Sequence, residues 1–191
     1  EILDLTPALR AEALQVASTL KTGPVFTPPI LRGEGGLLGT LFIANGANWP
    51  GGSFDPETGI MYVYSQSQRR VIGLSNDHSP ERSDMAYLAG AGGASMEVQG
   101  LPIIKPPWGR ITAIDLNRGE LVWQVAHGET PEFVQHHPAL AGVDVPRTGR
   151  IADAGGSSGG IGTLVTRTLV ISGEGGAPED GVYGTPAPGR G

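Results

Sequence analysis

Several residue types and patterns are missing from this chain of 191 residues, and each absence excludes a class of chemistry. The sequence contains no cysteine, so disulfide bonds, thiolate metal sites and cysteine nucleophiles are excluded. No stretch approaches 18 consecutive apolar residues, and the sequence therefore predicts no transmembrane helix. Basic residues are never clustered beyond the pair Arg69-Arg70, and the net charge is −6, which argues against a nucleic-acid partner.

Glycine and proline, by contrast, are abundant, with 31 glycines and 16 prolines in the chain. Such a content approaches that of disordered low-complexity chains. However, hydrophobic residues make up 39% of the sequence and the charges are dispersed, which argues against disorder. The composition therefore predicts an all-β fold with many tight turns and short strands.

One segment, residues 6–22, has the pattern of an α-helix. Thr6 is a favoured N-cap residue, Pro7 fits the first helical position, and Gly23 fits the position after the last turn. The apolar residues of the segment fall on one helical stripe: Leu9, Ala13, Val16 and Leu20.

Two hairpins of similar build are predicted around Asp-x-x-x-Gly turns at residues 55–59 and 115–119. In each turn the Asp caps the backbone and the Gly accepts a positive φ. Leu121, Trp123 and Val125 alternate after the second turn, as on one face of a strand. The repetition predicts several similar sheet units, as in a β-propeller, with Trp123 packed against an adjoining sheet.

The remaining segments are less regular. We expect a short buried strand near residues 40–44 and a hairpin over 163–172 that turns near Arg167. Residues 65–105 have little periodicity apart from a strand at Val71–Leu74, which is typical of an insertion or a mobile loop. Residues 127–150 form a polar connection.

The second hairpin carries the sequence pattern Ala113-x-Asp115-x-x-x-Gly119-x-x-x-Trp123. This spacing resembles the tryptophan-docking motif of quinoprotein propellers, although Arg118 stands where the family usually has Thr. Five further segments resemble the glucose-dehydrogenase-like branch of the pyrroloquinoline-quinone (PQQ) dependent dehydrogenases: 4–13, 26–29, 107–115, 127–131 and 137–140. The resemblance covers nearly the whole chain in order, with residues 65–105 matching least.

The resemblance implies the C-terminal part of an eight-bladed propeller, present as a fragment of about one and a half four-stranded blades with one N-terminal helix. Residues 1–32 are then a helical connection, 40–126 are one blade with an insertion at 65–105, and 151–176 are the inner half of the next blade. Within the first blade, 45–64 form the inner and 108–126 the outer hairpin. Because a propeller closes by joining its blades, we expect the chain to associate with the remainder of the propeller or with itself.

The same resemblance implies a PQQ site in which this chain supplies only part of the wall. The expected cofactor-binding residues are Asn48, Trp49, Ser158, Gly159 and Gly160. An Asn amide both donates and accepts hydrogen bonds, and glycines allow a ligand to approach the backbone closely. For a residue such as Asn48 in a glycine-rich loop, the alternative is a turn role, and for Ser158–Gly160 it is an inner strand without ligand.

The parent protein is then expected to oxidise a sugar or alcohol by hydride transfer to PQQ. Its Ca²⁺ ligands and catalytic Asp are expected in earlier blades, and its electron acceptor is a quinone or a cytochrome. The resemblance also implies a periplasmic location. We expect the isolated chain to be inactive, with no catalytic residue of its own.

Other sites are disfavoured by the sequence. The adjacent pair His136-His137 is a poor chelate, because neighbouring side chains on a strand point to opposite faces. The run 155–160 lacks the Gly-Lys-Ser/Thr of a phosphate loop. Two functions from other classes stay open: a non-enzymatic propeller scaffold for protein–protein contact, and a carbohydrate-binding β module. The low aromatic content, 6%, disfavours the second.

Overall fold

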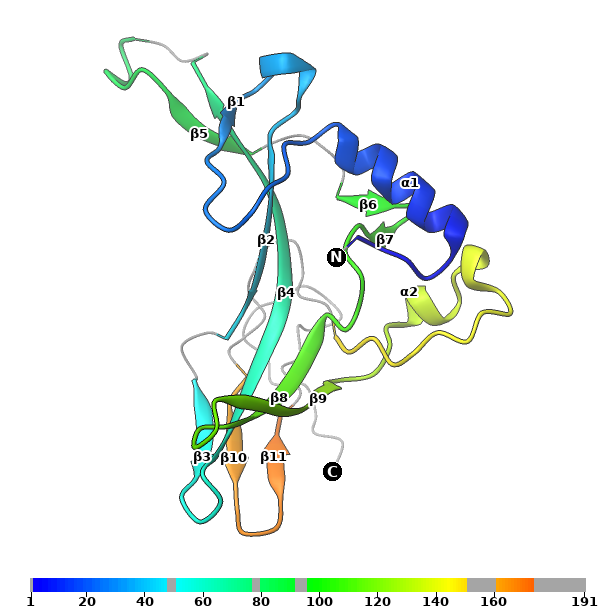
Figure 1. Ribbon diagram of the computed structural model, residues 1–191. Helices are drawn as coiled ribbons and strands as arrows, with labels where there is room; N and C mark the ends of the chain where they lie inside the picture. Colours follow the sequence, from blue (N-terminus) through cyan, green and yellow to red (C-terminus); the bar gives the residue numbers. More distant parts are fainter. Residues whose placement is uncertain (1, 48–50, 77–79, 92–95, 151–160, 174–191) are drawn as a thin grey trace. The chain divides into compact units, whose positions relative to one another are not determined.

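Figure 1 shows the computed structural model of the chain, which is mostly β with one main helix. It describes residues 2–47, 51–76, 80–91, 96–150 and 161–173. The chain divides into two compact units that each combine three segments of sequence. Unit 1 comprises Glu1–Ala44, Gln68–Pro106 and Glu132–Val145, and unit 2 comprises Asn45–Ser67, Pro107–Pro131 and Pro146–Gly191.

Unit 2 is built around an antiparallel arrangement of four strands in the order β3-β4-β8-β9. The strands are β3 (Gly52–Asp55), β4 (Ile60–Ser75), β8 (Gly109–Asp115) and β9 (Glu120–Ala126). The first part of β4 is central, because Ile60–Val63 pair with β3 on one side and with β8 on the other. Both hairpins predicted around the Asp-x-x-x-Gly turns are confirmed.

In both turns the aspartate side chain accepts hydrogen bonds from residues two and three positions later. Asp55 accepts hydrogen bonds from the backbone N–H of Glu57 at 3.0 Å and from Oγ1 of Thr58 at 2.6 Å. The Thr58 hydroxyl, followed by that N–H, lowers the pKa of Asp55. Asp115 instead accepts two backbone N–H bonds, one of them from Arg118, the residue that replaces the usual Thr.

The glycines that end these turns have φ values of 74° at position 59 and 68° at position 119, as the turn pattern predicts. The two turns also touch, since the backbone N–H of Leu116 donates to the carbonyl of Gly59 at 3.0 Å. The two hairpins are neighbours in one sheet, because β4 and β8 pair with each other. The expectation that they mark separate sheets is therefore wrong, whereas their assignment as the inner and outer hairpins of one blade stays a prediction.

A second, two-stranded sheet in unit 2 is formed by β10 (Thr163–Val165) and β11 (Val170–Ser172). This hairpin and its turn near Arg167 are confirmed. It lies beside β3, to which β10 is in contact. The mostly β fold with open sheets fits the expected partial propeller.

Unit 1 contains the main helix, α1 (Pro7–Ser18), which begins as predicted: the backbone N–H of Leu9 donates to Oγ1 of Thr6. The helix ends at Ser18 rather than near residue 22. The hydroxyls of Ser18 and Thr19 bond to carbonyls three residues earlier, and Lys21 already forms a bridge with Thr40. Local side-chain bonds of this kind compete with continued helix.

Short elements complete unit 1, together with the second part of β4. They are β1 (Ile30–Leu31), η1 (Glu34–Gly36), β2 (Thr40–Gly46), β5 (Leu88–Ala91), β6 (Glu97–Val98), β7 (Leu101–Pro102), α2 (Glu132–Gln135) and η2 (Pro138–Leu140). Its core is apolar and includes Leu3, Leu9, Ala13, Leu101, Ile103 and Val134. Strand β2 is longer than predicted and only partly buried, since Phe42 is half exposed.

Residues 65–105 are more regular than their pattern indicates, because β4 continues to Ser75 and pairs there with β1 and β5. Several polar side chains of this stretch are buried, including Gln66, Ser67 and Arg69. Burial of Arg69 is compensated by Glu97, whose carboxylate lies 3.3 Å away. Because buried positions of this strand are polar, the alternation of apolar and polar residues does not reveal the strand.

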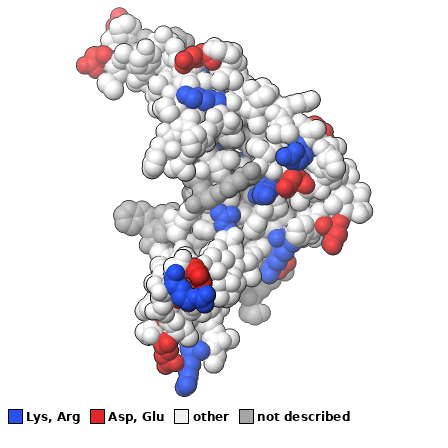
Figure 2. Space-filling view, viewed as in Figure 1, with Lys and Arg blue, Asp and Glu red and all other residues white. Residues whose placement is uncertain are grey.

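Lysines, arginines and acidic residues are scattered over the face drawn in Figure 2, most of which is uncharged. In the described part of the chain, no helix has both the length and the apolar character needed to cross a membrane.

Candidate functional site

The residues predicted to contact a cofactor, namely Asn48, Trp49, Ser158, Gly159 and Gly160, all lie outside the described residues. The candidate site is therefore built from the residues that flank them in unit 2. Strand β3 follows the first predicted segment, and β10 follows the second. Arg150 precedes the second segment in the chain.

The two flanking strands are joined by hydroxyl groups. Oγ of Ser53 lies 2.8 Å from Oγ1 of Thr163, and Oγ1 of Thr163 also lies 3.0 Å from the carbonyl oxygen of Tyr62. Since a hydroxyl both donates and accepts, Thr163 can donate to the carbonyl while it accepts from Ser53. The chain thus brings the strands that follow Asn48 and Gly160 into contact, although they belong to separate sheets.

Replacement of Thr163 by Val is expected to separate these strands. The variant removes both hydroxyl contacts while it keeps the size of the side chain, so we expect a loss of about 1–2 kcal/mol in the free energy of unfolding. Thr163→Ser keeps the hydroxyl and is the matched control. Urea denaturation followed by circular dichroism measures both, and equal losses in the two variants would contradict a role for the hydroxyl.

A buried cluster in unit 2 is formed by Tyr64, Ile111 and Ile161. The Tyr64 ring meets the imidazole of His127 edge to face, with 5.3 Å between ring centres. The Tyr64 hydroxyl also lies 3.3 Å from Oε1 of Gln66, which is buried as well. Ile161 therefore fixes one end of the segment 151–160 against this cluster.

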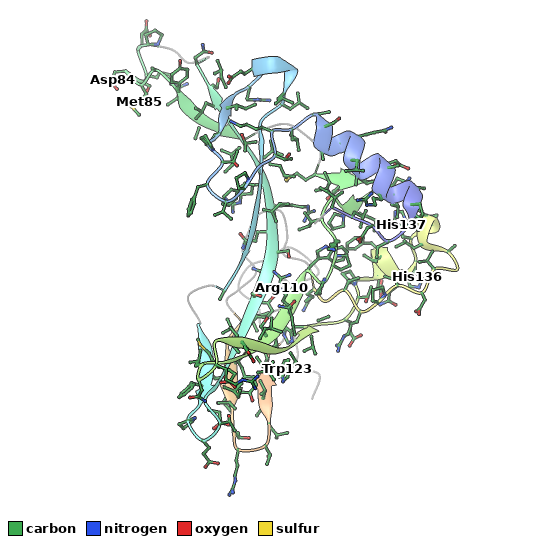
Figure 3. The ribbon with its side chains drawn as sticks, viewed as in Figure 1. Asp84, Met85, Arg110, Trp123, His136 and His137 are labelled. Atoms are coloured by element: carbon green, nitrogen blue, oxygen red, sulfur yellow. The ribbon has the colours of Figure 1, made fainter. Side chains whose placement is uncertain are left out.

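Two arginines supply positive charge near Tyr64, although the register of β4 and β8 places Arg110 on the face of the sheet opposite to Tyr64. Burial raises the pKa of Tyr64, and the charges of Arg150 and Arg110 oppose this rise. Arg110 donates to the hydroxyls of Ser65 at 3.2 Å and Ser67 at 3.1 Å and to a backbone carbonyl at 2.9 Å. Figure 3 labels Arg110 on β8.

The backbone around Arg150 is held tightly. The N–H of Arg150 donates to the carbonyl of His127, and the N–H of His127 donates to the carbonyl of Gly109, both at 2.9 Å. Nε2 of His127 lies 3.0 Å from the carbonyl oxygen of Gly173. Both ends of the segment 151–160 are therefore anchored at the Tyr64 cluster, one through Arg150 and the other through Ile161.

Trp123, labelled in Figure 3, lies on the same face as Tyr64. Its ring is 5.8 Å from that of Tyr62, in the same sheet, and the small residue Ala113 stands between them in the register. The ring contact seen in the described residues is therefore within the sheet. Stacking of Trp123 on an adjoining sheet stays a prediction.

The histidines at 136 and 137 take local structural roles in unit 1. Nδ1 of His137 accepts from the N–H of Ala139, and its Nε2 lies 2.8 Å from the carbonyl of Gln99. Nδ1 of His136 lies 3.1 Å from a carbonyl of α2. Across the part of the chain that the structure describes, no three His, Asp or Glu side chains gather as a metal site would require.

Sequence reasoning missed Tyr64, Arg110 and Arg150 as members of a candidate site. Tyr64 alternates with other apolar residues of its strand, which indicates only a sheet face. The arginines are isolated in the sequence, and only the pairing of β4 with β8 places Arg110 beside Ser65. For Arg150 one sequence signal was present: this single Arg stands shortly before the glycine-rich run 155–160.

A comparison with models of protein families identifies the family of this chain. The family model described as PQQ, glucose/ethanol/alcohol dehydrogenase, beta-propeller domain, matches residues 1–173. The chain belongs to this family of quinoprotein propellers. No curated protein and no solved structure matches it. The family accounts for the open, mostly β fold and is consistent with PQQ binding.

Proposed function

We propose that this chain is part of a PQQ-dependent dehydrogenase that oxidises a sugar or an alcohol. Membership of the quinoprotein propeller family supports a dehydrogenase-like function. The observation that carries the proposal to this chain is the joining of Ser53 to Thr163, because it brings the flanks of both predicted cofactor segments together. When bound, PQQ would supply the two-electron acceptor for the substrate hydride.

The described residues have a chemistry that fits such a cofactor. PQQ is a planar ring edged with carbonyls and carboxylates, and Arg150 and Arg110 provide positive charge near Tyr64, a residue of the cluster that contains Ile161. We infer that Asn48, Trp49 and the segment Ser158–Gly160 form the wall itself. In this assignment the arginines attract the carboxylates, Asn48 orients the ring edge, and the Tyr64 cluster excludes water.

Other parts of the protein would complete the site. Ca²⁺ and the catalytic base are proposed to come from preceding blades, and electrons are proposed to pass to a quinone or a cytochrome. Phe54 and Leu121 are 49% and 60% exposed, and such apolar positions would be covered by neighbouring blades or by another copy. We further propose a periplasmic location, as for related dehydrogenases.

Titration with PQQ tests the proposal. We expect a saturable, cofactor-linked change in absorbance, and a dissociation constant raised about tenfold or more in Asn48→Ala, because the proposed polar contact to the cofactor is lost. Asn76→Ala, in a loop of the chain remote in sequence from both segments, is the matched control. A chain that shows no PQQ-linked absorbance would contradict the proposal and favour the alternative of a non-enzymatic scaffold for protein–protein contact.

Turnover is a separate readout in the same samples. With PQQ, Ca²⁺, a dye acceptor and either glucose or ethanol, the chain alone is expected to give no dye reduction. Robust reduction would show that the catalytic base and the metal ligands are not restricted to other blades.

A further inference from the structure

His137, labelled in Figure 3, joins η2 to the turn between β6 and β7 through both nitrogens of its imidazole. Nδ1 lies 3.2 Å from the backbone nitrogen of Ala139, and Nε2 lies 2.8 Å from the carbonyl oxygen of Gln99. An N–H only donates and a carbonyl only accepts, so Nδ1 must accept and Nε2 must carry the proton. These two bonds, named here the His137 contact, therefore require the neutral imidazole with its proton on Nε2.

The bond to Ala139 makes His137 the N-cap of η2. The backbone of His137 is extended, and its side chain takes the place that Ser, Asp or Asn usually occupies before the first helical residue. Leu140, the last residue of η2, is buried, and its N–H donates to the carbonyl of His137 at 2.9 Å. The cap therefore orders the turn that places Leu140 in the core of unit 1.

On the other side of the His137 contact, Gln99 has a strained backbone. Its φ is 52°, in the left-handed region that residues other than glycine rarely adopt. Its carbonyl accepts from His137, and its side-chain amide donates to Oε1 of Glu12 on α1 at 2.7 Å. Because a strained conformation persists only where its surroundings enforce it, the His137 contact helps to maintain this turn.

No charged side chain contacts the imidazole of His137 in the part of the chain that the structure describes, since its polar partners are two uncharged backbone groups. The elements around it carry these titratable residues: Arg10 and Glu12 on α1, Glu97 on β6, and Glu132 and His136 on α2. Glu12 bonds Gln99, and Glu97 bonds the buried Arg69. A proton on Nδ1 would therefore cost the bond to Ala139 and gain no carboxylate partner in this geometry.

We propose that the His137 contact is a pH-sensitive switch, in which protonation of Nδ1 removes the cap of η2 and loosens the segment 132–145 from the turn at Gln99. Histidine is the side chain whose charge changes between about pH 5 and 8. An imidazolium carries N–H on both nitrogens, so Nδ1–H would meet the N–H of Ala139. The closed contact binds fewer protons than the open one, and its stability is therefore present at neutral pH and lost as the pH falls. The proposal does not depend on the bound cofactor.

Hydrogen–deuterium exchange of the segment 136–143 at pH 7.5 and pH 5.5 tests the switch, with each rate divided by the intrinsic rate at that pH. The amides of Leu140, Ala141 and Val143 are bonded within this segment. In the unmodified chain we expect their protection to fall about fivefold at the lower pH. His137→Asn supplies a favoured N-cap that does not titrate, so its protection is expected to be equal at both pH values.

His136→Asn is the matched control, because His136 is the adjacent histidine and lies outside the His137 contact. This variant is expected to lose protection as the unmodified chain does. In heteronuclear NMR of the unmodified chain, the amide of Ala139 is expected to shift with the same midpoint as the ring of His137. The proposal is overturned if the unmodified chain keeps its protection at pH 5.5, if His137→Asn loses protection equally, or if the Ala139 amide does not follow the ring.

Discussion

Replacement of Trp108 by Ala is expected to lower the free energy of unfolding by about 3–5 kcal/mol. The Trp108 side chain is fully buried, with 0% exposure, immediately before β8. Its backbone N–H donates to the carbonyl of Thr148, and its carbonyl accepts from Ser67, so the Ala variant keeps both bonds. The cavity and the apolar surface that the indole buries are expected to account for most of this loss.

A loss of this size is a large part of the stability of an ordinary domain, about 5–15 kcal/mol. Trp123→Ala is the control, because Trp123 is 36% exposed and should cost about 1–2 kcal/mol. Urea denaturation gives both values. If Trp108→Ala does not fold, Trp108→Phe replaces it, with an expected loss between the two. Similar losses for Trp108 and Trp123 would show that Trp108 is not the main packing residue of unit 2.

The contrast between these tryptophans also shows what the sequence could predict. Spacing around Asp115, Gly119 and Trp123 predicted the hairpin, because turn residues have local conformational requirements. Likewise, Thr6 and Pro7 predicted the start of α1. These features depend on interactions within a few residues, and they were found where expected.

The candidate site was less accessible to such reasoning. Its described members, Tyr64, Arg110, His127 and Arg150, come from separate segments and meet only through strand pairing. Nothing in the local pattern of β4 indicates that Ser67 is buried and bonded to Arg110, since a buried polar residue looks like an exposed one in a hydrophobicity pattern. The predicted residues Asn48 and Ser158–Gly160 rest on the family resemblance.

Gly149→Ala is expected to disrupt the anchor of the segment 151–160. Gly149 has a φ of 66°, and an added Cβ atom would overlap the carbonyl oxygen of Gly109 and lie 2.8 Å from that of His127. These neighbours are backbone atoms, which cannot move aside as a flexible side chain does. We expect a loss of about 3–5 kcal/mol, from the left-handed conformation together with the broken bonds between Arg150, His127 and Gly109.

Gly119→Ala separates the two contributions to this loss. Gly119 has a φ of 68°, but no atom lies within 4 Å of the position of its Cβ, so only the conformational cost of about 1–2 kcal/mol is expected. Urea denaturation measures both variants, and amide hydrogen exchange at Arg150 and His127 should accelerate only in Gly149→Ala. Equal stability of the two variants, or unchanged exchange, would mean that the backbone bonds of residues 149 and 150 do not depend on the absence of a Cβ atom at position 149.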